Sequence, residues 1–253
     1  MELRILGCYG GVVPGHRTTN FVVNGTTAID AGALSFSLTF EEQLNIRNVF
    51  ISHAHLDHTN SLPFLIDNVF GFVEQPIVVH SIEPVISAIR QHLFNDVTWP
   101  DFSVIPDEDS AILKFRIIQL HEPVRIGDIR YTAIPVNHII PCVGYLIEDD
   151  RAAVIFTADT GPCELIYEVA NRTPNLKAFI TEVSFPNEMQ SVADLSKHLT
   201  PRTFASEIAR LKPGPEVLLY HLKPPYIDQL HREVAELGLD FVSCIDQDRV
   251  YRF

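Results

Sequence analysis

Short apolar runs alternate along the chain with amphipathic segments, and turn residues separate them. The runs at residues 3–6, 20–23 and 26–30 have the composition of β-strands, and an Asn-Gly pair between the second and third favours a tight turn. These segments predict an opening group of strands. No repeat, low-complexity tract or linker is visible, which predicts a single domain over residues 1–253.

Two later segments have the periodicity of amphipathic helices. Behind a strand-like run at residues 49–52, apolar residues recur at positions i, i+3, i+4, i+7 and i+8: Leu62, Leu65, Ile66, Val69 and Phe70. Thr200 and Pro201 suit the N-cap and first position of another helix. One face of that helix carries Phe204, Ile208 and Leu211. Strands that alternate with helices predict an α/β fold.

Polar residues follow the points where apolar runs end. Three runs, at residues 131–136, 152–157 and 216–220, each stop just before a potential ligand: His138, Asp159 and His221. The run at residues 49–52 is followed in the same way by a loop rich in histidine. Because α/β folds place their chemistry at strand ends, we expect these side chains to meet at one edge of the fold.

The loop segment ISHAHLDHTN, at residues 51–60, holds four potential metal ligands within six positions: His53, His55, Asp57 and His58. Imidazole and carboxylate bind borderline divalent cations, and the H-x-H spacing puts two imidazoles on one side of an extended loop. One ion cannot easily use all four side chains, so two sites are predicted. The remaining ligands must come from the strand-end residues. The alternative is a polar loop whose histidines cap backbone groups.

Charge and cysteine content narrow the possible partners. The formal net charge is -13 and no basic run is present, which disfavours a long nucleic acid because polyanions are bound by clustered Lys and Arg. A small anion remains compatible, since bound dications make a pocket locally positive. The four cysteines form no C-x-x-C pair. Without a visible signal peptide or membrane-length apolar run, we expect a cytoplasmic protein with no membrane partner.

Four motifs occur in order over most of the chain: SHAHLDH, VNHIIPCVGYLI, IFTADTG and LLYHLKP. Together they resemble the ordered motifs of the metallo-β-lactamase superfamily. The resemblance implies an αββα sandwich with a two-metal site at one edge. It also implies two sets of ligands that share Asp159: His53, His55 and His138 for one ion, and Asp57, His58 and His221 for the other. Zinc is the expected metal, with manganese or iron as alternatives.

Within that superfamily, some details resemble phosphodiesterases. Leu56 in the H-x-H-L-D-H form and the segment LFNDVTWPDF at residues 93–102 resemble the class II cyclic nucleotide phosphodiesterases. The chain is also similar to ribonuclease Z, which trims transfer RNA ends. The segments TEVSF and SKHLTP resemble regions that these two branches share, and they mark Glu182 and His198 as catalytic residues that do not bind metal.

The resemblance therefore implies a homodimeric binuclear-metal phosphodiesterase that opens 3′,5′-cyclic nucleotides to 5′-monophosphates. A hydroxide that bridges the ions is the expected nucleophile. His198 would protonate the departing 3′-oxygen, Glu182 would orient His198, and Asp57 would orient the hydroxide as well as bind metal. The alternatives are a ribonuclease Z-like RNA 3′-end endonuclease, a thioester or lactone hydrolase, and a non-catalytic nucleotide-binding protein.

Overall fold

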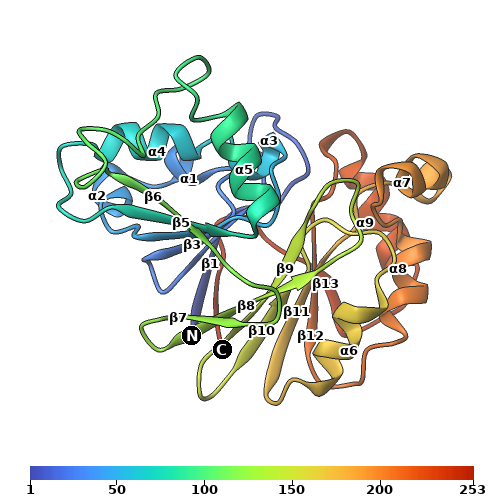
Figure 1. Ribbon diagram of the computed structural model, residues 1–253. Helices are drawn as coiled ribbons and strands as arrows, with labels where there is room; N and C mark the ends of the chain where they lie inside the picture. The colour runs from blue at the N-terminus through green and yellow to red at the C-terminus, as the bar shows by residue number, and fades with distance from the viewer.

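A computed structural model describes residues 1–253 and contains two β-sheets of seven strands each. The sheets pack face to face, and helices cover the outer side of each (Figure 1). The layers therefore run helix, sheet, sheet, helix. This arrangement confirms the αββα sandwich that the sequence motifs predicted.

The first sheet is built mainly from the N-terminal half of the chain. Its strands, in spatial order, are β14 (Val250–Arg252), β1 (Glu2–Gly7), β2 (Asn20–Val23), β3 (Thr27–Ile29), β4 (Asn48–Phe50), β5 (Ile77–Ser81) and β6 (Leu113–Ile117). Pairing is antiparallel from β14 to β3 and parallel from β3 to β6. Strands β3 and β4 therefore end at the same edge.

The second sheet comes from the C-terminal half. Its strands, in spatial order, are β13 (Val242–Cys244), β12 (Glu216–Tyr220), β11 (Leu176–Glu182), β10 (Ala153–Phe156), β9 (Val143–Glu148), β8 (Ile129–Pro135) and β7 (Pro123–Ile126). Pairing is antiparallel from β7 to β10 and parallel from β10 to β13. Strands β8, β10, β11 and β12 consequently all end at one edge.

Alternating side chains of each strand pack into different layers. Leu3 and Ile5 of β1 belong to the core between the sheets, whereas Leu6 belongs to the core under the N-terminal helices. In β12, Tyr220 faces the other sheet and Leu219 faces the C-terminal helices. Because both faces of central strands such as β2, β10 and β12 are buried, these strands are continuous apolar runs, whereas the border strands β6 and β7 also carry exposed residues. Polar residues are thus confined largely to the strand ends.

The helices are short. Those over the first sheet are α1 (Leu34–Ser37), α2 (Phe40–Gln43), α3 (Leu56–Thr59), α4 (Leu62–Val69) and α5 (Glu83–His92). The later ones are α6 (Glu164–Arg172), α7 (Gln190–Ser196), α8 (Pro201–Ile208) and α9 (Ile227–Ala235), with 3₁₀ turns η1 (Asn187–Met189) and η2 (Pro224–Tyr226). None has the length and apolar character needed to cross a bilayer.

Both predicted amphipathic helices form, with differences at their ends. Helix α8 begins as expected, because the Thr200 side chain accepts a hydrogen bond from the Thr203 backbone N–H. It ends at Ile208, so Leu211 lies beyond the helix. Helix α4 buries the predicted face except for Phe70, which follows the last helical residue and is 39% exposed. The last apolar residue of each predicted face thus lies beyond its helix, by one residue for Phe70 and by three for Leu211.

His80 in β5 is a buried histidine far in the sequence from the predicted ligands. Its side chain is packed against the Phe50 ring, and its Nε2 lies 2.9 Å from Asn48 Oδ1. Burial, with a further contribution from Arg116, lowers the pKa of His80 to about 4. The folded protein therefore keeps this imidazole neutral at a pH where the unfolded chain protonates it. Stability from this group is complete above about pH 6.5 and is lost as the pH falls towards 4.

We predict that His80→Gln weakens this acid sensitivity. Between pH 7 and pH 5, the unsubstituted protein should lose about 2 kcal/mol more unfolding free energy than the variant. Denaturant unfolding at the two pH values measures the difference, and His92→Gln on the exposed end of α5 is the control. Equal losses in the His80 variant and the unsubstituted protein would show that His80 is not held neutral.

Candidate metal centre

His53, the first of the four ligands in this segment, lies three residues after the end of β4. His53 and His55 lie in an extended stretch, as expected, with His55 at the N-cap of α3. The prediction of a loop for the whole segment was wrong for Asp57 and His58, which lie in α3. A four-residue helix is too short to show an apolar period, so the sequence pattern could not reveal it.

The other predicted ligands come from the second sheet. His138 follows β8, Asp159 follows β10, and His221 directly follows β12. His221 and Ala158, which precedes Asp159, have positive φ angles of 66° and 55°. Non-glycine residues adopt this conformation at an energetic cost, and such strain concentrates at functional sites. The strand ends thus turn these side chains sharply towards the first sheet.

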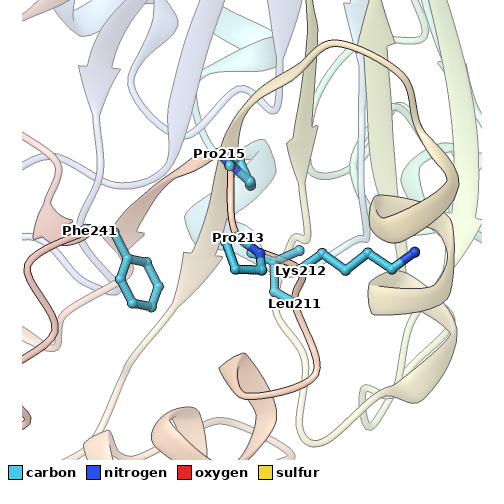
Figure 2. A pocket seen from close by; sticks show the side chains of 6 residues that line it. Leu211, Lys212, Pro213, Pro215 and Phe241 are labelled. Carbon is cyan, nitrogen blue, oxygen red and sulfur yellow. The ribbon is translucent and has the colours of Figure 1, made fainter.

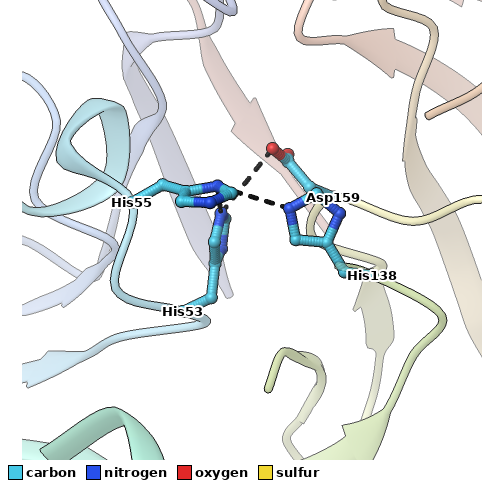
Figure 3. Close-up of side chains that lie close together, drawn as sticks. All are labelled: His53, His55, His138 and Asp159. Carbon is cyan, nitrogen blue, oxygen red and sulfur yellow. Dashed lines mark hydrogen bonds and ion pairs between the residues drawn. The ribbon is translucent and has the colours of Figure 1, made fainter. Parts of the chain in front are cut away.

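Three imidazoles and one carboxylate form the first donor group (Figure 3). His55 Nδ1 lies 3.0 Å from His53 Nε2 and 3.3 Å from His138 Nε2. Asp159 Oδ2 is 3.8 Å from His53 Nε2. Burial lowers the pKa of His53 well below its ordinary value and that of His138 to about 4, so both rings keep a free lone pair.

The second donor group contains Asp57, His58, Asp159 and His221. His221 Nε2 is 3.2 Å from an oxygen of each aspartate, Asp57 and Asp159. His58 Nε2 lies 3.4 Å from the same Asp159 oxygen. Asp159 therefore contributes to both groups, as its predicted bridging position requires. The Asp57 side chain is 25% exposed, so the second group is reachable from solvent.

The donor sets fit divalent ions. Ligand atoms around a tetrahedral ion with bonds of about 2.0–2.2 Å lie about 3.3–3.6 Å apart, close to the separations found in both groups. His58 Nε2 is buried without a hydrogen-bond partner, which is costly unless an ion uses its lone pair. The structure thus brings all seven predicted ligands into two groups that can hold metal. Their assignment as ligands stays a prediction.

Glu182 and His198 form a close pair beside these groups. His198 Nδ1 lies 2.6 Å from Glu182 Oε1, and the His198 ring stacks on His221 with centroids 5.3 Å apart. Burial opposes a charged imidazole, but the adjacent Glu182 carboxylate outweighs this and raises the pKa of His198. The structure therefore places an imidazole held by a buried carboxylate next to the second donor group. The role of His198 as a proton donor stays a prediction.

Three polar residues at the site were not among the predicted site residues. Asp30, which follows β3, accepts a hydrogen bond from His58 Nδ1 at 2.7 Å. Ser52 and Ser184 follow β4 and β11 and contact His53 and His221. These three residues follow apolar runs, as Asp159 and His221 do. The same sequence signal could therefore have identified them.

A separate hollow lies at the opposite edge of the second sheet (Figure 2). It has a volume of about 190 Å³ and is lined by Leu211, Lys212, Pro213, Gly214, Pro215 and Phe241. These residues precede β12 and β13, whereas the candidate ligands follow the strands. None of the predicted site residues lines this hollow.

Two ligand groups that share a carboxylate, at one edge of an αββα sandwich, are the features of a metal-dependent hydrolase fold. The model of a protein family described as "Beta-lactamase superfamily domain" matches residues 20–222. The chain therefore belongs to the β-lactamase superfamily, in its metallo-β-lactamase form. This confirms the family that the four motifs indicated.

Two relatives in sequence have names that refer to cyclic nucleotides. A "Probable 3',5'-cyclic-nucleotide phosphodiesterase" of Yersinia pestis is 26% identical and aligns with 94% of this chain and 82% of its own length. A "3',5'-cyclic-nucleotide phosphodiesterase" of Aliivibrio fischeri is 26% identical, with 82% and 74% covered. A ribonuclease Z of Bacteroides thetaiotaomicron is 32% identical over 59% of this chain and 48% of its own.

Solved structures share the fold. Unliganded yeast PDE1 superposes with a TM-score of 0.82 at 18% identity, covering 98% of both chains. The short form of human tRNase Z has a TM-score of 0.69 at 15% identity, covering 100% of this chain and 99% of the other. At these identities the likeness establishes the architecture and nothing about the substrate.

Asp159→Asn is expected to weaken the binding of both ions, because its carboxylate belongs to both donor groups. We expect each affinity to fall by more than about 100-fold, since even outer partners of ligands contribute 10–100-fold. Metal-to-protein ratios after competition with a chelator measure the effect. Asp57→Asn should weaken one ion only, and the exposed Asp128→Asn should weaken neither. An Asp159 variant that kept two tightly bound ions would show that Asp159 does not bridge.

Proposed function

We propose that this protein is a binuclear-metal phosphodiesterase that hydrolyses 3′,5′-cyclic nucleotides to 5′-monophosphates. Two divalent ions, with zinc as the expected metal, would bind to His53, His55 and His138 on one side and to Asp57, His58 and His221 on the other. Asp159 would contact both. Imidazole-rich donor sets favour zinc, while the carboxylates also admit manganese or iron.

The observation that carries the proposal is the His198–Glu182 pair beside the ligand groups. Opening the cyclic ester breaks the bond from phosphorus to the 3′-oxygen, and the departing alkoxide is strongly basic. A proton donor positioned near this oxygen therefore accelerates the step. The leaving group of a thioester is a much less basic thiolate, so hydrolysis of a thioester has less need of a proton donor. The pair thus favours ester chemistry at phosphorus over a thioester substrate.

Each side chain would have a separate role in the reaction. When bound, the two ions supply an activated water and neutralise charge on the phosphoryl oxygens. Glu182 holds His198 by Nδ1, at 2.6 Å, so that Nε2 carries the proton that passes to the 3′-oxygen. Asp57, whose side chain is 25% exposed, would accept a hydrogen bond from the attacking water.

The comparisons support a cyclic nucleotide over a long RNA. Alignment with the Yersinia pestis phosphodiesterase spans 94% of the chain, whereas alignment with the ribonuclease Z spans 59%. The net charge of -13 also opposes a transfer RNA, whose binding depends on neutralised phosphates. A nuclease on the same scaffold remains the second candidate, because that relative is the more identical one over its aligned part.

The cytoplasm is the proposed compartment. All four cysteines are free thiols in the structure, and free thiols persist under reducing conditions. A homodimer is expected from the family resemblance alone.

The proposed function is tested by turnover of metal-reconstituted protein on four phosphate esters. Cyclic AMP, cyclic GMP, 2′,3′-cyclic AMP and a 3′-extended transfer RNA are compared at equal enzyme concentration. We expect a 3′,5′-cyclic nucleotide to be opened fastest, with the 5′-monophosphate as product. Preferred cleavage of the RNA, with affinity that falls steeply as salt rises, would identify a nuclease instead.

His198→Ala should remove the proton donor and leave the ions in place. Turnover is expected to fall by about 10²–10⁴-fold, which is the usual contribution of general acid catalysis. Metal content measured on the same preparation should stay unchanged. The matched control is His121→Ala, which alters an exposed turn histidine. If turnover of the His198 variant were unaltered, another group would have to supply the proton.

A further inference from the structure

Two buried pairs, each made of a carboxylate and a serine, lie behind the imidazoles of the candidate metal centre. Asp30 and Ser52 form one pair at the edge of the first sheet, and Glu182 and Ser184 form the other at the edge of the second. All four residues are fully buried. In each pair, the carboxylate contacts one imidazole directly, and the serine links the same carboxylate to a second imidazole.

In the first pair, Asp30 forms a hydrogen bond with His58, and Ser52 forms one with His53. The Ser52 hydroxyl donates to Asp30 Oδ2 at 2.9 Å, and the Ser52 backbone N–H donates to Asp30 Oδ1 at 2.7 Å. His53 Nδ1 lies 2.9 Å from the same hydroxyl oxygen. A hydroxyl has one proton, which is already given to Asp30. Ser52 must therefore accept a hydrogen bond from His53 Nδ1–H, and this leaves His53 Nε2 without a proton.

The second pair repeats this arrangement with different residues. The Ser184 hydroxyl donates to Glu182 Oε2 at 2.6 Å, and His221 Nδ1 lies 2.9 Å from the hydroxyl oxygen. Glu182 also receives His198 Nδ1 at 2.6 Å and two backbone N–H groups, so it acts only as an acceptor. The single Ser184 proton is thus committed to Glu182. His221 Nδ1–H consequently donates to Ser184, and His221 Nε2 has a free lone pair.

The His221 ring has little freedom to find another acceptor. Its backbone has a φ of 66°, and its N–H donates to the Cys8 carbonyl at 2.7 Å. A Cβ atom at Gly10 would lie 2.7 Å from His221 Nδ1, so the ring packs directly against that glycine. Because the backbone and one ring face of His221 are fixed, its tautomer depends on the hydrogen-bond partner of Nδ1. That partner is the Ser184 oxygen.

On the basis of the two-ion site proposed above, we infer that Ser52 and Ser184 are positioning residues that each fix the tautomer of one metal ligand. Ser52 acts on the ion bound by His53, His55 and His138. Ser184 acts on the other ion, through His221. A ligating imidazole binds metal through its unprotonated nitrogen, and a hydrogen bond from the other nitrogen sets which one that is. The two serines therefore act on different ions of the same centre.

The tautomers are tested by nitrogen NMR of the full-length chain, labelled at histidine, metal-free and at pH 8. In the unsubstituted protein, His53 and His221 are expected to carry their proton on Nδ1. Ser52→Ala should change the proton position only at His53, and Ser184→Ala only at His221, so that each variant controls for the other. His198 Nδ1 lies 3.2 Å from the Ser184 oxygen but keeps its 2.6 Å contact with Glu182 in the Ser184 variant. Ser52→Thr and Ser184→Thr keep a hydroxyl and should restore the original signals. A proton on Nε2 of either ring in the unsubstituted protein would overturn the inference, even if an alanine variant did not fold.

Zinc affinity gives a second readout that needs no substrate. Each alanine variant should bind one of two zinc ions about 10–100-fold more weakly and the other normally. Two unchanged affinities, or equal weakening of both ions by both variants, would contradict selective positioning by the serines. If the tautomers and affinities behaved as expected but no cyclic nucleotide were hydrolysed, the proposed function would fail and the serine roles would stand.

Discussion

The proposed metal centre depends on one constraint, which is that its buried imidazoles must each offer an unprotonated nitrogen to an ion. An imidazole has two ring nitrogens, so the proton on the other one needs an acceptor in the same dry space. Asp30 supplies this acceptor directly for His58 and, through the Ser52 hydroxyl, for His53. Glu182 supplies it for His221 through the Ser184 hydroxyl, and it also holds His198. The negative charge of both carboxylates would also offset the charge of divalent ions at the proposed centre. The carboxylates behind the histidines are therefore as much a part of the centre as the histidines themselves.

The sandwich explains why this chemistry lies at one edge. Strands buried on both faces have little room for polar side chains along their length, whereas their ends open towards solvent and towards the other sheet. The turns there are tight, and Asp30, Ala158 and His221 all have positive φ angles. Three buried hydrophobic clusters stabilise the fold around these residues, which keeps their backbone in a conformation that non-glycine residues otherwise avoid. The free energy gained by packing the core thus offsets the cost of these strained backbone conformations at the site.

The sequence was informative where several signals agreed. The cluster of histidines and aspartate in residues 53–58 was visible as a local pattern, and the rule of polar residues at strand ends located His138, Asp159 and His221. The same rule could have identified Asp30, but it was not predicted, because a single aspartate after a short strand resembles any turn residue. Ser52 and Ser184 were still harder to predict from the sequence, because the role of a serine depends on the partners that the fold places around it. Helix α3 was missed because four residues cannot display a helical period.

The distance along the chain between the ligands affects how the protein is made. About 160 residues separate His58 from His221, and at synthesis rates of about 5–20 residues per second the first segment waits on the order of ten to thirty seconds for the last ligand. Strand β14, which borders β1, emerges later still. If the seven candidate ligands hold two ions as proposed, the complete donor set would form only after β12 has been made and His221 has reached the segment around His53.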